Sequence, residues 1–198
     1  MINPDGHEYT NDAIRLWLKN RRPSSGSNVG VDLTRNWNSQ WGVIGGSFRP
    51  VDQSYVGLGP FSEPETRAMS RYIEGISQNL IALLSFRGFG QRFIIPASPA
   101  SNYEEMLRIG RRAMGALAVR YDTQYRVGSS RDVFDGATGV IADWVKFRFN
   151  PPIVATYALR DTGARGYTLP VQEVEPSCEE TFDSIMAVIR EAKLANLL

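Results

Sequence analysis

Two of the side chains that usually bind zinc in proteins are almost missing from this sequence. Its 198 residues contain one cysteine, Cys178, and one histidine, His7. A single cysteine cannot form a disulfide within the chain, and a catalytic zinc ion usually takes three protein ligands drawn mainly from histidine, cysteine and a carboxylate. The composition alone therefore argues against a zinc enzyme. A site built only from carboxylates, for a harder cation, stays open, although we find no spaced acidic motif for it.

The sequence also lacks a charge imbalance and a long apolar run. Lys and Arg number 22 against 21 Asp and Glu, which gives a net charge of +1. Nucleic-acid-binding proteins usually carry a basic patch, so we expect no nucleic-acid partner. No stretch approaches the roughly 18 apolar residues of a membrane span, and the first ten residues lack the basic and apolar regions of a signal peptide. We expect no membrane contact, and the sequence assigns neither a compartment nor an oligomeric state.

What the sequence does contain is an alternation of helical patterns with short, nearly continuous apolar runs. A chain of 198 residues buries about 70% of its unfolded surface, so we expect one domain over residues 1–198. Strands that are apolar on both faces and separated by helices indicate an α/β sandwich around a mixed or parallel sheet. The expected strands are Leu80–Phe86, Arg92–Ile95 and Ile153–Leu159, and the expected helices are Ser62–Gln78, Tyr103–Tyr121, Thr138–Phe149 and one that begins at Ser177.

Local signals predict where several of these elements begin. Ser62 with Glu65, and Ser177 with Glu180, have the spacing of a capping box at the start of a helix. The turn residues from Asn3 to Gly6 predict a loop at the start of the chain. Residues 38–60 are rich in Gly, Ser and aromatic residues without periodicity, which predicts a long irregular segment. In the last helix, the apolar spacing predicts a buried face made of Phe182, Ile185, Met186 and Ile189.

The strand that ends at Leu159 leads into a polar turn, Arg160 to Gly163. Ligands of α/β folds usually bind beyond the carboxyl ends of strands, so the last residues of this strand are natural positions for catalytic groups. The residue at that position is Ala158. Its methyl group can neither transfer a proton nor bind a metal.

Several motifs in register give the sequence a specific resemblance. They are, in order, NPDGHEYT, RLW followed by K, GVDLTRNW, SEPET, and LRDTG followed by GY and LP. From Asn3 to the C-terminal helix, the chain resembles the zinc carboxypeptidases of the A/B type, which remove the C-terminal residue of a peptide and are mostly secreted. The resemblance implies a three-layer α/β/α sandwich around a mixed sheet, with the N-terminal part of that fold missing from the printed residues.

The resemblance also implies a catalytic apparatus. It comprises one zinc ion held by a His-x-x-Glu pair and a later histidine, a glutamate that activates the metal-bound water, and an arginine that polarises the scissile carbonyl. An Asn-Arg pair binds the terminal carboxylate of the substrate, and a tyrosine closes over the bound substrate. Metal and base together create hydroxide near neutral pH, while fixed cations stabilise the oxyanion and orient the substrate.

This sequence has other residues at the positions to which the resemblance assigns these roles. The later histidine ligand corresponds to Arg87, which is cationic and has no lone pair to offer a metal. The general base corresponds to Ala158, the oxyanion arginine to Leu18 and the closing tyrosine to Asp135. The His-x-x-Glu pair would precede the NPDG motif, with which the printed chain begins. We therefore predict no catalytic residue, no metal ligand and no cofactor for this chain.

One residue of the pair that would bind the substrate carboxylate is retained, namely the arginine. In GVDLTRNW the pair reads Thr34-Arg35, so Arg35 could make a bidentate contact with a carboxylate while Thr34 replaces the amide partner. An ion pair within the protein is the other reading of Arg35. The residue that sets pocket preference in this family corresponds to Ala142, which is small and uncharged and would suit an apolar side chain.

Four functional hypotheses follow. The first is a carboxypeptidase-like protein without catalysis, and the second is an active zinc carboxypeptidase completed by a further N-terminal segment. The third is a module that binds peptide C-termini through Arg35. The fourth is a gene fragment that does not fold.

Overall fold

The computed structural model describes residues 1–23, 29–97, 101–133 and 136–198. Its residue contacts divide the chain into two compact units. The first unit comprises Met1–Leu80 and Asp135–Phe149, and the second comprises Ile81–Phe134 and Asn150–Leu198. The expectation of one domain stays a prediction, and each unit is described by itself below.

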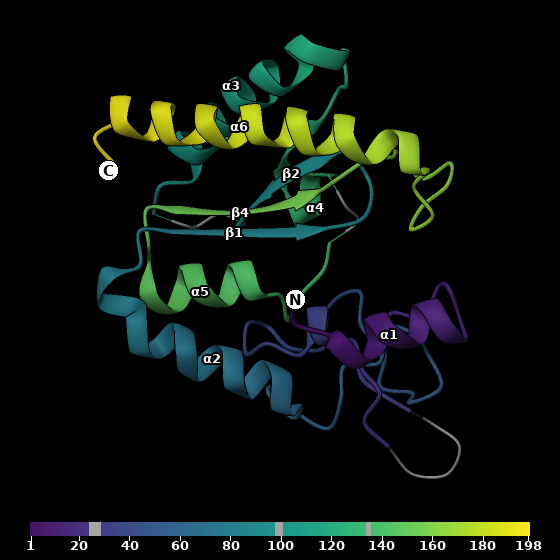
Figure 1. Cartoon of the computed structure of the whole chain (residues 1–198). Helices are drawn as coiled ribbons and strands as arrows, with labels where there is room; N and C mark the ends of the chain where they lie inside the picture. Colours follow the sequence, from purple (N-terminus) through teal and green to yellow (C-terminus); the bar gives the residue numbers. More distant parts are fainter. Residues whose placement is uncertain (24–28, 98–100, 134–135) are drawn as a thin grey trace. The chain divides into compact units, whose positions relative to one another are not determined.

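The first unit contains helices and irregular chain. Its helices are α1 (Pro4–Asp12), the 3-10 turn η1 (Leu33–Arg35), α2 (Pro64–Ile76), the 3-10 turn η2 (Ser77–Asn79) and α5 (Ile141–Phe149) (Figure 1). Residues 38–60 contain neither a helix nor a strand of the named elements, as the sequence predicted. An aromatic cluster forms the centre of this unit, since the rings of Trp37 and Trp144 lie 5.3 Å apart and Phe61 meets both edge-on.

The second unit is built on a mixed sheet of four strands, β1 (Ala82–Arg87), β2 (Arg92–Ile95), β3 (Arg126–Ser129) and β4 (Ile153–Ala158). Their order is β1-β4-β2-β3; β1 runs parallel to β4, β2 runs antiparallel to β4, and β3 runs parallel to β2. This confirms the α/β class with a mixed sheet. The sequence missed β3, which has only four residues and includes Gly128.

Two long helices, α3 (Tyr103–Tyr121) and α6 (Val174–Leu194), pack against each other over this sheet (Figure 1). The short helix α4 (Ser130–Val133) follows β3, and the 3-10 turn η3 (Val171–Glu173) precedes α6. Within the part of the chain that the structure describes, no helix is long and apolar enough to cross a membrane. The buried core of the unit includes Phe93, Ile109, Leu117, Tyr157 and Val188.

The predicted loop at the start of the chain is wrong, because the turn residues cap a helix instead. The side chain of Asn3 accepts a hydrogen bond from the backbone N–H of Gly6 at 3.1 Å, which makes Asn3 the N-cap of α1. Pro4 occupies the first helical position, where a missing N–H is harmless.

The capping box predicted at Ser62 is also wrong. The helix begins at Pro64, and its N-cap, Glu63, makes no side-chain capping bond. The hydroxyl of Ser62 donates to the carboxylate of Glu63 at 2.9 Å and accepts from Asn36 Nδ2 at 3.0 Å. Glu65 accepts from Asn20 Nδ2 at 3.1 Å rather than reaching back to the chain before the helix.

The predictions for the last helix fail in two ways. The helix begins at Val174, before the predicted cap at Ser177, and Glu180 accepts from Arg160 at 2.8 Å instead of completing a capping box. Two members of the predicted buried face are exposed, Phe182 at 62% and Met186 at 51%. The face that is buried consists of small and polar residues, namely Ser177, Glu180, Thr181, Ser184, Ala187, Val188, Glu191 and Ala192.

Candidate functional site

In the first unit, the buried carboxylate of Asp32 organises the turn that contains Thr34 and Arg35. Asp32 is the N-cap of η1, and its Oδ1 accepts from the backbone N–H of Thr34 at 3.0 Å and from the Thr34 hydroxyl at 2.6 Å. Its Oδ2 accepts from Nε of Arg35 at 3.0 Å. Hydrogen bonds between charged groups are short and strong, so this carboxylate fixes the plane of the Arg35 guanidinium.

The Nη1 atom of Arg35 is buried and makes no hydrogen bond within the described residues. The Arg35 side chain is 15% exposed, and Nη1 lies against Gly45, where an added Cβ would come within 2.9 Å of it. Gly45 has a φ of +72°, which glycine adopts without strain. A buried donor without an acceptor costs about 1–3 kcal/mol, so this nitrogen favours an additional acceptor such as a carboxylate oxygen.

The structure is thus compatible with both interpretations of Arg35, an ion pair within the protein and a contact with the carboxylate of a ligand. The ion pair with Asp32 uses Nε, and the donor at Nη1 remains for another group. Thr34 is exposed, but its hydroxyl proton is directed to Asp32, so Thr34 offers an incoming group only the lone pairs of its oxygen.

The other two predicted positions of this unit add no charge. Leu18 is 36% exposed, and its backbone N–H donates to Oε1 of Gln53 at 3.3 Å. Ala142 is buried in the first turn of α5. Neither side chain can stabilise an oxyanion, because neither has a polar atom.

In the second unit, Ala158 lies at the end of β4 between two arginines. It is fully buried, and its partners across the sheet are Arg87 on β1 and Arg92 on β2. Arg87 donates from Nε to the carbonyl of Gly88 at 3.2 Å and from Nη2 to the hydroxyl of Tyr167 at 3.2 Å. This end of the sheet therefore presents guanidinium groups on both sides of a methyl group.

The described residues do not fit a zinc ion. Among them, no group of three or more His, Cys, Asp and Glu side chains gathers within reach of one metal. His7 is exposed on α1 and Cys178 is exposed on α6. The guanidinium of Arg87, at the position expected of a ligand, would also repel a metal cation.

The turn after β4 is held by buried ionic contacts that the sequence did not reveal. Arg160 donates from Nε to Glu180 at 2.8 Å and from Nη2 to the hydroxyl of Thr123 at 2.7 Å. Burial acts to raise the pKa of the neighbouring Asp161, but hydrogen bonds from three backbone N–H groups hold it below its ordinary value. Those donors belong to Gly163, Arg165 and Gly166.

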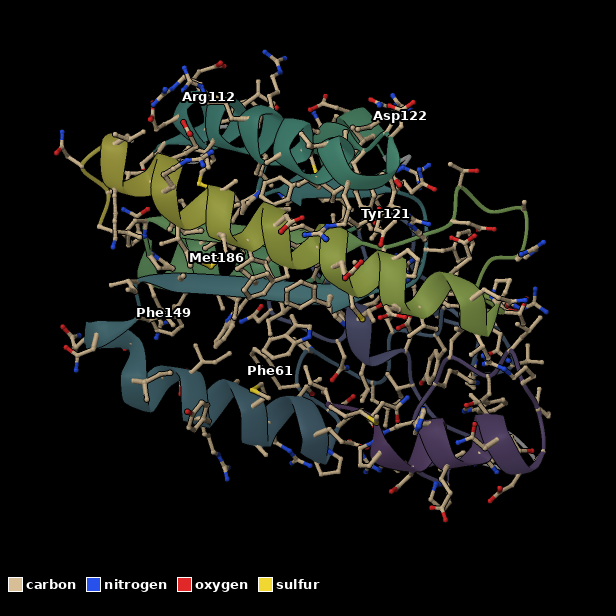
Figure 2. The ribbon with its side chains drawn as sticks, turned by 45° about the horizontal axis from the view of Figure 1, so that its top comes forward. Phe61, Arg112, Tyr121, Asp122, Phe149 and Met186 are labelled. Carbon is tan, nitrogen blue, oxygen red and sulfur yellow. The ribbon has the colours of Figure 1, made fainter. Side chains whose placement is uncertain are left out.

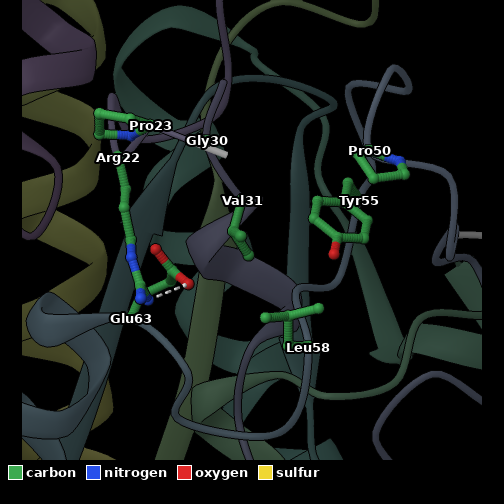
Figure 3. A pocket seen from close by; sticks show the side chains of 8 residues that line it. All are labelled: Arg22, Pro23, Gly30, Val31, Pro50, Tyr55, Leu58 and Glu63. Carbon is green, nitrogen blue, oxygen red and sulfur yellow. Dashed lines mark hydrogen bonds and ion pairs between the residues drawn. The ribbon is translucent and has the colours of Figure 1, made fainter. Parts of the chain in front are cut away.

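The first unit also has an open cavity of about 460 Å³ away from the predicted positions (Figure 3). Nη1 of Arg22 donates to the carboxylate of Glu63 at 3.2 Å and to the carbonyl of Ser62 at 2.7 Å, so its charge is already compensated. The residues that line the cavity are Arg22, Pro23, Gly30, Val31, Pro50, Tyr55, Leu58 and Glu63.

Asp135, the position of the closing tyrosine, lies outside the described residues. Sequence reasoning missed Asp32 and Arg92, although both carry signals. Asp32 precedes Arg35 by three residues, the spacing at which side chains meet in a helical turn. Arg92 begins a strand that the sequence predicted, but only the strand order places it next to Ala158.

Comparison with known proteins shows the family of this chain. The family model described as zinc carboxypeptidase matches residues 1–184, and the chain belongs to that family. It is 38% identical to human carboxypeptidase O over 194 residues, which cover 96% of this chain and 52% of that protein. It is 36% identical to the zinc carboxypeptidase of Simulium vittatum, covering 98% of this chain and 66% of that protein. The chain thus spans about half the length of human carboxypeptidase O.

Solved structures confirm the fold. Bovine thrombin-activatable fibrinolysis inhibitor, in complex with tick carboxypeptidase inhibitor, matches with a TM-score of 0.92 at 27% identity, over 100% of this chain and 68% of that chain. Carboxypeptidase A from Helicoverpa armigera matches with a TM-score of 0.89 at 26% identity, over 98% of this chain and 50% of that chain. The fold described above is therefore a part of the zinc carboxypeptidase domain.

Proposed function

We propose that this chain binds the C-terminal carboxylate of peptides through Arg35 and does not hydrolyse them. The observation that carries the proposal is the Arg35 guanidinium, which Asp32 orients through Nε and which keeps a buried donor at Nη1 without an acceptor. A carboxylate accepts bidentate hydrogen bonds from arginine, so it is the ligand class that fits this group best.

The absence of catalysis follows from three substitutions. Arg87 cannot bind a metal, Ala158 cannot accept a proton, and Leu18 cannot stabilise an oxyanion. Loss of one oxyanion donor costs roughly 10²–10³ in rate, and loss of a general base costs about 10²–10⁴. The combined losses leave no effective peptidase. A further segment that supplied His-x-x-Glu would still leave a methyl group at Ala158.

Small apolar C-terminal side chains are the proposed preference, because the residue at the pocket position, Ala142, is small and uncharged. The test is calorimetry with two forms of one probe, N-acetyl-Gly-Gly-Val as the free acid and as the C-terminal amide. One charge-assisted hydrogen bond is worth about 1.5–3 kcal/mol, so the free acid should bind at least about tenfold more tightly. In Arg35→Ala this difference should disappear.

A matched control separates this contact from general charge effects. Arg22→Ala removes an arginine of the same unit whose charge is compensated by Glu63, so it should leave the difference between acid and amide unchanged. Equal heats for the two probes with the wild-type protein would end the proposal of carboxylate binding.

The proposal that the chain does not hydrolyse peptides is tested by a separate assay. We expect no release of the C-terminal residue from an N-blocked chromogenic peptide and no stoichiometric zinc by elemental analysis after dialysis. Metal-dependent hydrolysis would refute the non-catalytic reading while leaving the role of Arg35 untouched. An uncooperative thermal melt would instead favour the fourth hypothesis, a fragment that does not fold.

A further inference from the structure

Helix α6 exposes several apolar side chains and buries several polar ones beside Ala187, Val188 and Ala192. Phe182 is 62% exposed and Met186 is 51% exposed, and Cys178 on the same helix is also exposed (Figure 2 labels Met186). On the opposite side Ser184 and Glu180 are fully buried. A helix at the surface of a monomer usually shows the reverse arrangement, so the exposed side of α6 has the character of an interface.

Together with the half-buried Ile189, these exposed residues form a row, which we term the α6 stripe and define as Cys178, Phe182, Met186 and Ile189. Their spacing of three or four residues places them on one face of the helix. The steps along the stripe are four, four and three residues, close to the alternating steps of three and four between the positions that meet a second helix in a coiled-coil seam. The stripe is therefore suited to pack against another helix rather than against irregular chain.

Charged residues at the two ends of the stripe have opposite signs. Glu175 lies on the same face in the first turn of α6, followed by Glu179, and Lys193 lies on that face in the last turn, after Arg190. Glu175, Arg190 and Lys193 are exposed. An antiparallel copy of the same helix would bring the acidic end of each helix to the basic end of the other.

We propose that the α6 stripe is the contact through which a second copy of this chain binds, with the two α6 helices antiparallel about a two-fold axis that passes between Phe182 and Met186. In this register Phe182 of each copy faces Met186 of the other, and Glu175 faces Lys193. A two-fold contact requires one surface that is complementary to itself, which the central pair of Phe182 with Met186 and the outer pair of Glu175 with Lys193 satisfy.

The area buried in the proposed contact limits the affinity of the dimer. A helix of 21 residues is about 30 Å long, and one pair of such helices buries less than the roughly 1,600 Å² of a standard interface. We therefore expect a reversible dimer with a dissociation constant of roughly micromolar order or weaker.

Sedimentation equilibrium of the whole chain over a wide range of concentrations tests the proposal. Met186→Asp should raise the dissociation constant of the dimer at least tenfold, because it places a charge within the apolar row. Val119→Asp is the control, since Val119 is 85% exposed on α3 and lies outside the stripe. It should leave the dissociation constant unchanged.

A charge exchange tests the antiparallel register. Glu175→Lys alone should weaken the dimer, and Glu175→Lys combined with Lys193→Glu should restore it. A wild-type protein that stays monomeric at every concentration would overturn the proposal, as expected if a helix from another segment or protein covers the stripe. A dimer that is insensitive to Met186→Asp, or one that the double exchange does not restore, would overturn it equally.

Discussion

Replacement of Tyr157 by phenylalanine should make the stability of the protein less sensitive to alkaline pH. Tyr157 on β4 is fully buried, and its hydroxyl shares a hydrogen bond of 2.6 Å with the hydroxyl of Ser184 on α6. Burial raises the pKa of Tyr157 from 10.0 to about 12, against a smaller opposing effect of the Ser184 hydrogen bond. The folded state therefore keeps the phenol protonated at pH values where the unfolded state releases the proton.

The sign and the size of the effect follow from proton linkage. A pKa that is raised in the folded state contributes stability that is present in full below pH 10 and is lost as the pH rises towards 12. With 1.36 kcal/mol per pKa unit, the loss is about 1.4 kcal/mol at pH 11. Tyr157→Phe removes this loss, but it also removes one buried hydrogen bond, which costs about 0.5–1.5 kcal/mol at neutral pH.

Urea unfolding followed by far-ultraviolet circular dichroism at pH 8 and pH 11 measures both effects. The wild type should be more stable than Tyr157→Phe at pH 8, and the two should approach equal stability at pH 11. Tyr72→Phe is the matched control, since Tyr72 is 64% exposed and water reaches its hydroxyl in the folded state. The reasoning would be refuted if wild type and Tyr157→Phe lost the same free energy of unfolding between the two pH values.

Two further substitutions test the structure around the candidate site. Arg160→Met should reduce the free energy of unfolding by about 3–5 kcal/mol in chemical denaturation, because it leaves the buried carboxylate of Glu180 without its cation, whereas Arg108→Met in an exposed pair should cost at most about 1 kcal/mol. Gly45→Ala should weaken the preference of the protein for a free-acid peptide over its amide in calorimetry, because the added Cβ would lie 2.9 Å from Nη1 of Arg35; an unchanged preference would show that the guanidinium does not need this space.

The local pattern of the sequence was sufficient for the elements with strong periodicity. The bounds predicted for residues 92–95 and 103–121 coincide with β2 and α3, because both segments carry their own apolar pattern. Helix starts were less predictable. Asn3 and Ser62 have the same capping chemistry, yet only Asn3 caps a helix, since Asn36 and Glu63 engage the hydroxyl of Ser62.

The candidate site was predictable in part. From the motif GVDLTRNW we predict that Arg35 is the retained cation, and from the strand-turn motif after β4 we predict that Ala158 stands at the position of the general base. The motif did not reveal that the carboxylate of Asp32 orients Arg35, nor that Arg92 lies beside Ala158. Both facts depend on backbone geometry and strand order, which residue types alone do not specify.

The sequence by itself determined the family, and with it the mixed α/β fold. The loss of the side chains that would bind zinc or transfer a proton stays a prediction from the same motifs. Only the tertiary structure decided which face of α6 is buried. Its polar residues find partners far away in the chain, as Ser184 does in Tyr157 and Glu191 in Arg112, so they can be buried at little cost. Such pairs join residues that no local periodicity connects, and Phe182 and Met186 of the α6 stripe consequently lie on the outside.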